Sequence, residues 1–380
     1  MRQVWVSSIA CMLTESGTTR LFTSDAPLTM SNGATLGPVD VAWERYGELA
    51  PDRSNVVFIC HALTGDAHAA GLREGDTKPG WWDSIIGPGK PIDTDRFHVI
   101  CANLLGGCRG TTGPASVDPA TGESYGLTFP EIHVADYVNV HRALMKEFGI
   151  ERLAAVVGGS MGGMQALHWG LRHPEELRSI AVIAASSRLT AQNIAFSAVA
   201  RAAIMRDPGF HDGRYLELGD QPSMGLSIAR MMAHITYLSE EGMAEKFGRR
   251  FQEGDAKHGF GVDFAVESYL EYQGRTFLNR FDALTYLYLT RSMDYFDPFA
   301  DADAAHMMAE LQIPALVVSF DSDWRFDTGH SRRIVRELEQ ARVPVSFREI
   351  SCPWGHDSFL LSDPDYHATV RAFLQGVQYV

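Results

Sequence analysis

Residues 158–162 read GGSMG and fit the pattern G-x-S-x-G, which can present a serine hydroxyl as a nucleophile. The serine sits on a tight turn between a strand and a helix, and the flanking glycines leave room that a Cβ would block. A buried strand is expected over 153–159 and an amphipathic helix from Met161, so the context fits. We predict Ser160 as a nucleophile; the alternative is a glycine-rich packing turn. A dinucleotide loop is excluded because G-x-G-x-x-G is missing.

A nucleophilic serine needs a base and an orienting acid, which follow it in the order acid, then histidine, when it sits on such a turn. Residues 315–320 (ALVVSF) predict a strand that ends directly before Asp321-Ser322-Asp323, and both aspartates qualify by position. Residues 345–350 (VSFREI) predict the last strand, and His356 follows it on a loop. Among the 14 histidines, His356 is therefore the predicted general base.

Acyl chemistry also needs two backbone donors for the oxyanion. The predicted strand 56–60 (VVFIC) is followed by the loop 61–66 (HALTGD). We predict that the N–H of Leu63, together with that of Met161, forms the oxyanion hole. His61 is interpreted as a packed histidine that anchors this loop.

The elements that must position these residues alternate between strand and helix, which predicts an α/β fold with a mostly parallel sheet and helices on both faces. Further strands are expected at 98–103 and 180–185. Residues 188–300 are rich in Met, Ala, Arg and aromatic side chains at helical spacing. We predict a core domain of residues 1–187 and 301–380 with an inserted helical cap at 188–300. A separate helical domain on a linker is the weaker alternative.

Composition excludes several classes of protein. The 380 residues carry a net charge of −14, which argues against nucleic-acid binding and leaves any anionic substrate in need of a local basic site. Five scattered cysteines predict neither disulfides nor zinc and favour a reducing, cytoplasmic location. No apolar run approaches the ~18 residues of a membrane span. Residues 4–13 resemble a signal peptide only weakly and are expected to form a flexible N-terminal segment or an edge strand. No metal or flavin motif is present.

Seven stretches together carry a resemblance to one family. The chain resembles the homoserine O-acyltransferases of methionine biosynthesis, of the α/β-hydrolase fold, through HALTGDAHAAG (61–71), GWWDSIIGPGKPIDTDRF (80–97), NLLGGCRGTTGPAS (103–116), GGSMGGMQAL (158–167), RMMAHITYLSE (230–240), VESYLEYQGRTF (266–277) and PWGHDSFL (353–360). These stretches span most of the chain beyond residue 30, including the predicted cap.

The resemblance implies ping-pong transfer of an acyl group from acyl-CoA to homoserine, with acyl-CoA as a co-substrate and no bound cofactor. It favours Asp323 over Asp321 as the acid. It further implies that Arg230 binds the homoserine carboxylate, that Asp357 holds the amino group, and that Tyr237 lines the acyl-CoA tunnel. Each of these three has an alternative role in a salt bridge, a turn or packing. A homodimer through the cap helices is also implied.

One position departs from the common family pattern. In family members that use acetyl-CoA, the acid and the two residues after it usually read D-W-L. This chain has Asp323-Trp324-Arg325 at these positions. A succinyl group ends in a carboxylate, with which a guanidinium can pair, so Arg325 favours succinyl-CoA over acetyl-CoA. The alternative is that Arg325 faces solvent or pairs with Asp327. Arg109, where many relatives have Gln, is a second cation without an assigned role.

Three rival functions differ from homoserine acylation. Acyl transfer to serine and hydrolysis of an ester need the same triad and differ only in the acceptor. A catalytically inactive binding protein of the same fold is disfavoured, because the three triad residues are all present.

Overall fold

The computed structural model describes residues 13–377, which form a central eight-stranded sheet in the order β1-β4-β8-β5-β9-β10-β11-β12. The six strands from β8 to β12 in this order run parallel, whereas β1 and β4 are antiparallel at one edge. The sheet strands are β1 (Leu13–Phe22), β4 (Val39–Tyr46), β5 (Val56–Cys60), β8 (His98–Ala102), β9 (Ala155–Gly159), β10 (Ile180–Ile183), β11 (Ala315–Phe320) and β12 (Val345–Ile350).

All six strands predicted from apolar runs are present, with small shifts at their ends. β10 ends at Ile183 rather than at 185, because Ala184 adopts a φ of 47°, which breaks the extended backbone. β1 and β4 were not predicted. β4 alternates buried and half-buried side chains, a pattern typical of a strand with only one fully covered face. The stretch 4–13 lies outside the described residues except for Leu13.

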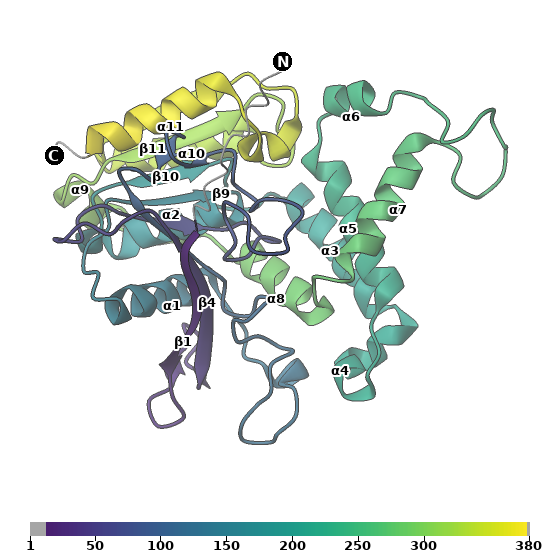
Figure 1. Cartoon of the computed structure of the whole chain (residues 1–380), viewed down its shortest axis with the longest axis horizontal. Coiled ribbons are helices and arrows are strands. Elements are labelled where there is room, and N and C mark those ends of the chain that lie inside the picture. The colour runs from purple at the N-terminus through teal and green to yellow at the C-terminus, as the bar shows by residue number, and fades with distance from the viewer. Residues whose placement is uncertain (1–12, 378–380) are drawn as a thin grey trace, which may run out of the picture.

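Helices cover both faces of the sheet, as Figure 1 shows for α1 and α11. Alternate strand residues face opposite cores: Phe58 and Val156 pack with the α1, α2 and α10 side, whereas Val57 and Val157 pack with α11. The helices of this part are α1 (Val134–Glu147), α2 (Met161–Arg172), α9 (His306–Glu310), α10 (Thr328–Gln340) and α11 (Pro364–Val377). The predicted α/β fold class is therefore confirmed.

Residues 188–300 form helices, most of which stand beside the sheet in Figure 1; the exception is α8. α3 packs on α5, and α5 packs on α7. α8 instead lies against the core, where the Ser292 hydroxyl is 2.7 Å from the Tyr137 hydroxyl. These helices are α3 (Ala191–Met205), α4 (Tyr215–Leu218), α5 (Ser223–Tyr237), α6 (Glu240–Lys246), α7 (Ala265–Phe277) and α8 (Ala283–Asp294). The division into core and inserted cap stays a prediction.

The remaining strands are short pairs, β2 (Leu28–Thr29) with β3 (Thr35–Leu36) and β6 (Ile86–Gly87) with β7 (Ile92–Asp93). Among residues 13–377, no helix combines the length and apolar character needed to cross a membrane.

Candidate active site

Ser160 occupies the sharp turn between β9 and α2, with φ 57° and ψ −123°. The glycines around it are required by close backbone contacts. A Cβ on Gly158 would lie 2.1 Å from the carbonyl oxygen of Gly162, and a Cβ on Gly162 would lie 2.0 Å from that of Cys60. The backbone strain at Ser160 is held by its N–H, which donates to the carbonyl of Ile183 at 2.9 Å. The turn thus fixes the Ser160 hydroxyl above the sheet.

The structure brings Ser160, His356 and Asp323 together in one chain of hydrogen bonds. Ser160 Oγ lies 2.8 Å from His356 Nε2, and His356 Nδ1 lies 2.7 Å from Asp323 Oδ2. All three are buried, with 7%, 2% and 2% of their surface exposed. The Asp323 carboxylate accepts a hydrogen bond from Nδ1–H of His356, which leaves the Nε2 lone pair facing the serine hydroxyl. In this tautomer His356 can take the proton of Ser160.

The loops after β11 and β12 decide between the two candidate acids. The second oxygen of Asp323 accepts the backbone N–H groups of Arg325 and Phe326, both at 2.9 Å, so this carboxylate is fixed in place. Asp321 instead accepts the N–H of Cys352 at 3.0 Å and ties the two loops together. It is Asp323 that reaches the histidine.

Ser160 lines a cavity of about 60 Å³. Four of the other residues predicted for the site line this cavity, namely Leu63, Tyr237, Arg325 and Asp357. They come from the loop after β5, from α5 and from the loops after β11 and β12. The carboxyl ends of the parallel strands therefore meet the end of α5 at one place, as is usual for open α/β sheets.

Of the two predicted oxyanion donors, Met161 directly follows Ser160, and Leu63 lines the same cavity as Ser160. Leu63 lies in a turn closed by the bond from Gly65 N–H to the carbonyl of Ala62 at 3.0 Å. Met161 is the first residue of α2, so its N–H has no acceptor within the helix. His61 is buried at the start of this loop, with Nε2 3.0 Å from Asn103 Oδ1 after β8, and burial lowers its pKa.

Three arginines line the cavity or contact its wall at Thr64, although the chain as a whole is acidic. Arg325 Nη1 donates to Thr236 Oγ1 at 2.7 Å and Arg230 Nη1 to Thr64 Oγ1 at 3.4 Å. Arg280 Nη1 donates to the carbonyl of Thr64 at 2.9 Å. Within residues 13–377, none of the three forms an ion pair with an acidic side chain. Their charges are thus free to attract an anionic substrate.

Sequence reasoning missed Arg280, because it lies in no motif that carries chemistry. It occupies the turn between α7 and α8, and its contact with Thr64 joins residues 216 positions apart in the chain. Only the docking of this turn against the loop after β5 makes the contact.

Asp357 provides the opposite charge beside Arg230. Burial raises the pKa of Asp357 to about 6, while electrostatic interactions with His356 and Arg230 act against this rise. Arg230 is buried, and its guanidinium lies over the ring of Tyr237 at 5.9 Å. No ion pair within 4.0 Å links Arg230 and Asp357, both of which are described residues. A cation and an anion held apart in this way suit the carboxylate and ammonium groups of an amino acid.

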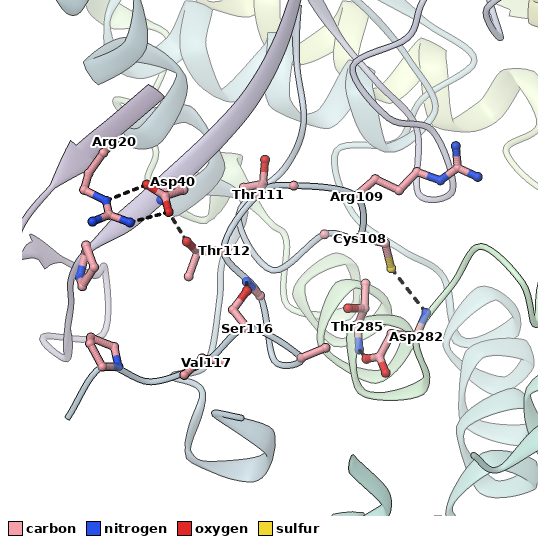
Figure 2. A pocket seen from close by; sticks show the side chains of 16 residues that line it. Arg20, Asp40, Cys108, Arg109, Thr111, Thr112, Ser116, Val117, Asp282 and Thr285 are labelled. Carbon is pink, nitrogen blue, oxygen red and sulfur yellow. Dashed lines mark hydrogen bonds and ion pairs between the residues drawn. The ribbon is translucent and has the colours of Figure 1, made fainter. Parts of the chain in front are cut away.

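A second and larger cavity, of about 550 Å³, lies between β4, the loop after β8 and the start of α8 (Figure 2). It shares no lining residue with the cavity at Ser160. Arg20 and Asp40 pair with each other at 2.8 Å on its wall. Figure 2 shows Arg109 extending away from this pair, and Arg109 Nη1 lies 3.2 Å from Asp66 Oδ2. Arg109 therefore forms an ion pair with Asp66, at the end of the loop 61–66.

One group of potential metal ligands occurs within residues 13–377. His173, Glu175 and Glu176 place one ligand atom each within 4.8 Å of one another. Glu176 already accepts three bonds from Arg142, at 2.6 to 3.0 Å, and one from Trp169 at 2.9 Å. These bonds use the carboxylate, so the group has an ordinary structural role.

The fold and the arrangement of Ser160, His356 and Asp323 define an α/β-hydrolase. Residues 55–363 match the family described as the alpha/beta hydrolase fold. The solved esterase E22 is 29% identical, with a TM-score of 0.85 over 95% of this chain and 99% of that one. The solved homoserine O-acetyltransferase from Bacillus anthracis is 27% identical, with a TM-score of 0.86 over 95% of this chain and 97% of that one.

Curated relatives narrow the class further. A homoserine O-succinyltransferase of Magnetococcus marinus is 57% identical over 93% of this chain and 92% of its own length. A homoserine O-acetyltransferase of Rhodospirillum rubrum is 50% identical over 93% of this chain and 91% of its own length. The chain therefore belongs to the homoserine O-acyltransferases, a family of acyltransferases with the α/β-hydrolase fold. The resemblance drawn from the sequence motifs is confirmed.

Proposed function

We propose that this protein transfers an acyl group from acyl-CoA to the hydroxyl of L-homoserine through an acyl-Ser160 intermediate. The observation that carries the proposal is the hydrogen-bonded set of Ser160, His356 and Asp323, which opens on a cavity beside a cation and an anion. The names of the relatives indicate homoserine as the acceptor, and the charges around the cavity fit its carboxylate and ammonium groups.

Two half-reactions use the same groups. In the first, His356 Nε2 takes the Ser160 proton while Oγ attacks the thioester carbonyl, and the N–H groups of Leu63 and Met161 hold the oxyanion. Collapse breaks the C–S bond, and the leaving CoA thiolate takes the proton from His356. In the second, His356 takes the proton of the homoserine hydroxyl, whose oxygen attacks the acyl-serine. Collapse releases the O-acyl product, and the proton returns to Ser160.

The acceptor is selected by charge at its amino-acid end. Arg230 binds the homoserine carboxylate and Asp357 binds the ammonium group, which places the side-chain hydroxyl toward His356. Tyr237, whose ring centre is 6.0 Å from that of His356, lines the path of the acyl-CoA. Serine as an acceptor and water as an acceptor, which would make the protein an esterase, are the alternatives. Serine is one methylene shorter, so its hydroxyl would fall short of the base.

The donor is selected by Arg325, which lines the cavity at Ser160. Its guanidinium is free of acidic partners among residues 13–377 and can pair with the distal carboxylate of a succinyl group. Asp327, the alternative partner, instead accepts the N–H of Gly329 at 2.8 Å and caps α10. We therefore propose succinyl-CoA as the donor. The 50% identical relative named an acetyltransferase keeps acetyl-CoA as the competing donor.

The cellular setting follows from this activity. We place the protein in the cytoplasm, at the first committed step of methionine biosynthesis. We also propose a homodimer through the cap helices, because α3 and α5 carry exposed apolar side chains that a partner subunit would cover. These are Val199, Met205, Met224, Ile228 and Ile235. Light scattering on the purified protein tests the dimer, and Ile228→Asp should favour the monomer.

One experiment separates the candidate functions. The purified protein is supplied with acetyl-CoA or succinyl-CoA, each with homoserine, serine or water alone, and free CoA is measured by thiol trapping. We expect free CoA to be released rapidly with homoserine and slowly with serine or with water alone. Mass spectrometry without acceptor should show one acyl group on the Ser160 peptide, and none in Ser160→Ala. His367→Ala, on α11, is the control for His356→Ala. An adduct on another residue would refute the covalent route.

A further inference from the structure

The turn between α7 and α8 is rigid. The N–H groups of Arg280 and Phe281 both donate to the carbonyl of Phe277 at 3.1 Å, and the rings of Phe277 and Phe281 stack with their centres 4.7 Å apart. Asp282 then caps α8, and its backbone N–H donates to Cys108 Sγ at 3.3 Å, as Figure 2 shows. The backbone from which the Arg280 side chain extends is therefore held in place.

Arg280 ends on the turn that carries the proposed oxyanion donor. Its Nη1 donates to the carbonyl of Thr64 at 2.9 Å, and Thr64 follows Leu63 in the turn from Ala62 to Gly65. A charge-assisted bond of this kind is about twice as strong as a neutral one. The other bond to Thr64 from this side is that of Arg230, which is longer, at 3.4 Å.

We propose that Arg280 is a positioning residue, which holds the loop 61–66 so that the Leu63 N–H points at the oxyanion. The inference rests on the proposed roles of Ser160 and Leu63. On the sheet side, the loop is held by His61, whose Nε2 lies 3.0 Å from Asn103 Oδ1, directly after β8. On the opposite side, Arg280 completes the support, which makes the oxyanion hole depend on the docking of the segment between α7 and α8.

Direct recognition of a substrate anion is the competing role for the same guanidinium. Burial and the charges of Arg230 and Arg109 lower the pKa of Arg280 to about 10, so it is positively charged at neutral pH in either role. The two roles predict different kinetics. A positioning residue affects both half-reactions equally, because both pass through the same oxyanion hole. A residue that binds an anion affects only the step in which that anion is bound.

The test uses p-nitrophenyl acetate, an uncharged acyl donor. The pre-steady-state release of p-nitrophenolate measures acylation of Ser160, and saturating homoserine then measures transfer. Loss of an oxyanion donor costs about 10² to 10³ in rate, so Arg280→Met, which only loosens a donor, should cost on the order of tenfold in both steps. The KM for homoserine should stay unchanged. Arg275→Met, at an exposed position of α7, is the control.

Circular dichroism establishes that each variant folds. Should Arg280→Met unfold, Arg280→Gln, whose shorter amide cannot reach Thr64, carries the same expectation. Unchanged p-nitrophenolate release, with a raised KM for homoserine or for acyl-CoA, overturns the positioning role in favour of anion binding. Absence of release from the wild-type protein would instead count against Ser160 as the nucleophile.

Discussion

Replacing Arg325 by leucine should change which acyl-CoA the enzyme uses. Arg325 Nη1 donates to Thr236 Oγ1 at 2.7 Å, and its remaining donors can face the cavity at Ser160. Leucine keeps an apolar side chain of moderate size there but removes the charge. The triad is untouched, since the hydrogen bond from residue 325 to Asp323 is donated by the backbone N–H, which leucine keeps.

The size of the effect follows from one charge-assisted hydrogen bond. Such a bond contributes about 1.5 to 3 kcal/mol, which corresponds to roughly tenfold to hundredfold in preference. Arg325 is half-buried, so solvent screens part of the interaction and the lower end is expected. Arg325→Leu should therefore lower kcat/KM for succinyl-CoA by about tenfold, while kcat/KM for acetyl-CoA stays equal or rises.

The assay measures kcat/KM for both donors at saturating homoserine, with free CoA trapped as a thiol adduct. Arg332→Leu is a matched control, because Arg332 is exposed on α10 and pairs with Glu349 at 3.1 Å away from the cavity. Equal losses with both donors would show that Arg325 supports the structure through Thr236. A wild-type protein that strongly prefers acetyl-CoA would refute the assignment of the donor.

Three further predictions concern the acid, the acceptor and the turn. Asp323→Asn should lower turnover by about 10⁴, because His356 would lose its orienting partner, whereas Asp321→Asn should have a small effect; a reversed order would make Asp321 the acid. Burial raises the pKa of Asp357 to about 6, so its carboxylate becomes protonated as the pH falls below that value, and the KM for homoserine should rise; a KM that is flat from pH 5 to 8 would remove Asp357 from the ammonium site. Gly162→Ala places a Cβ 2.0 Å from the Cys60 carbonyl oxygen and should cost at least about 1–3 kcal/mol in urea unfolding; unchanged stability would show that the turn can move.

Much of the fold is predictable from the sequence, because buried parallel strands appear as short apolar runs. The six inner strands follow this rule. β4 was missed although it alternates, since its half-buried residues include Asp40 and Arg45, which dilute the apolar signal. β1 was missed because an edge strand is covered on one side only, and its side chains from Glu15 onward are exposed or half-buried. The sequence indicated helices up to residue 300, but not that α8 packs on the core.

The sequence by itself was enough to propose the nucleophile and the base. Ser160 is set by glycines at fixed spacing, and His356 by chain order and by its place after the last strand, both of which are local signals. Asp323 and Asp321 follow the same strand, and only the packed loops show which carboxylate reaches the histidine. Arg280 depended on tertiary structure alone, because its partner lies 216 residues away and nothing local distinguishes it from other arginines of residues 188–300. Local patterns encode turns and strands, whereas a long-range contact exists only once separately encoded elements dock.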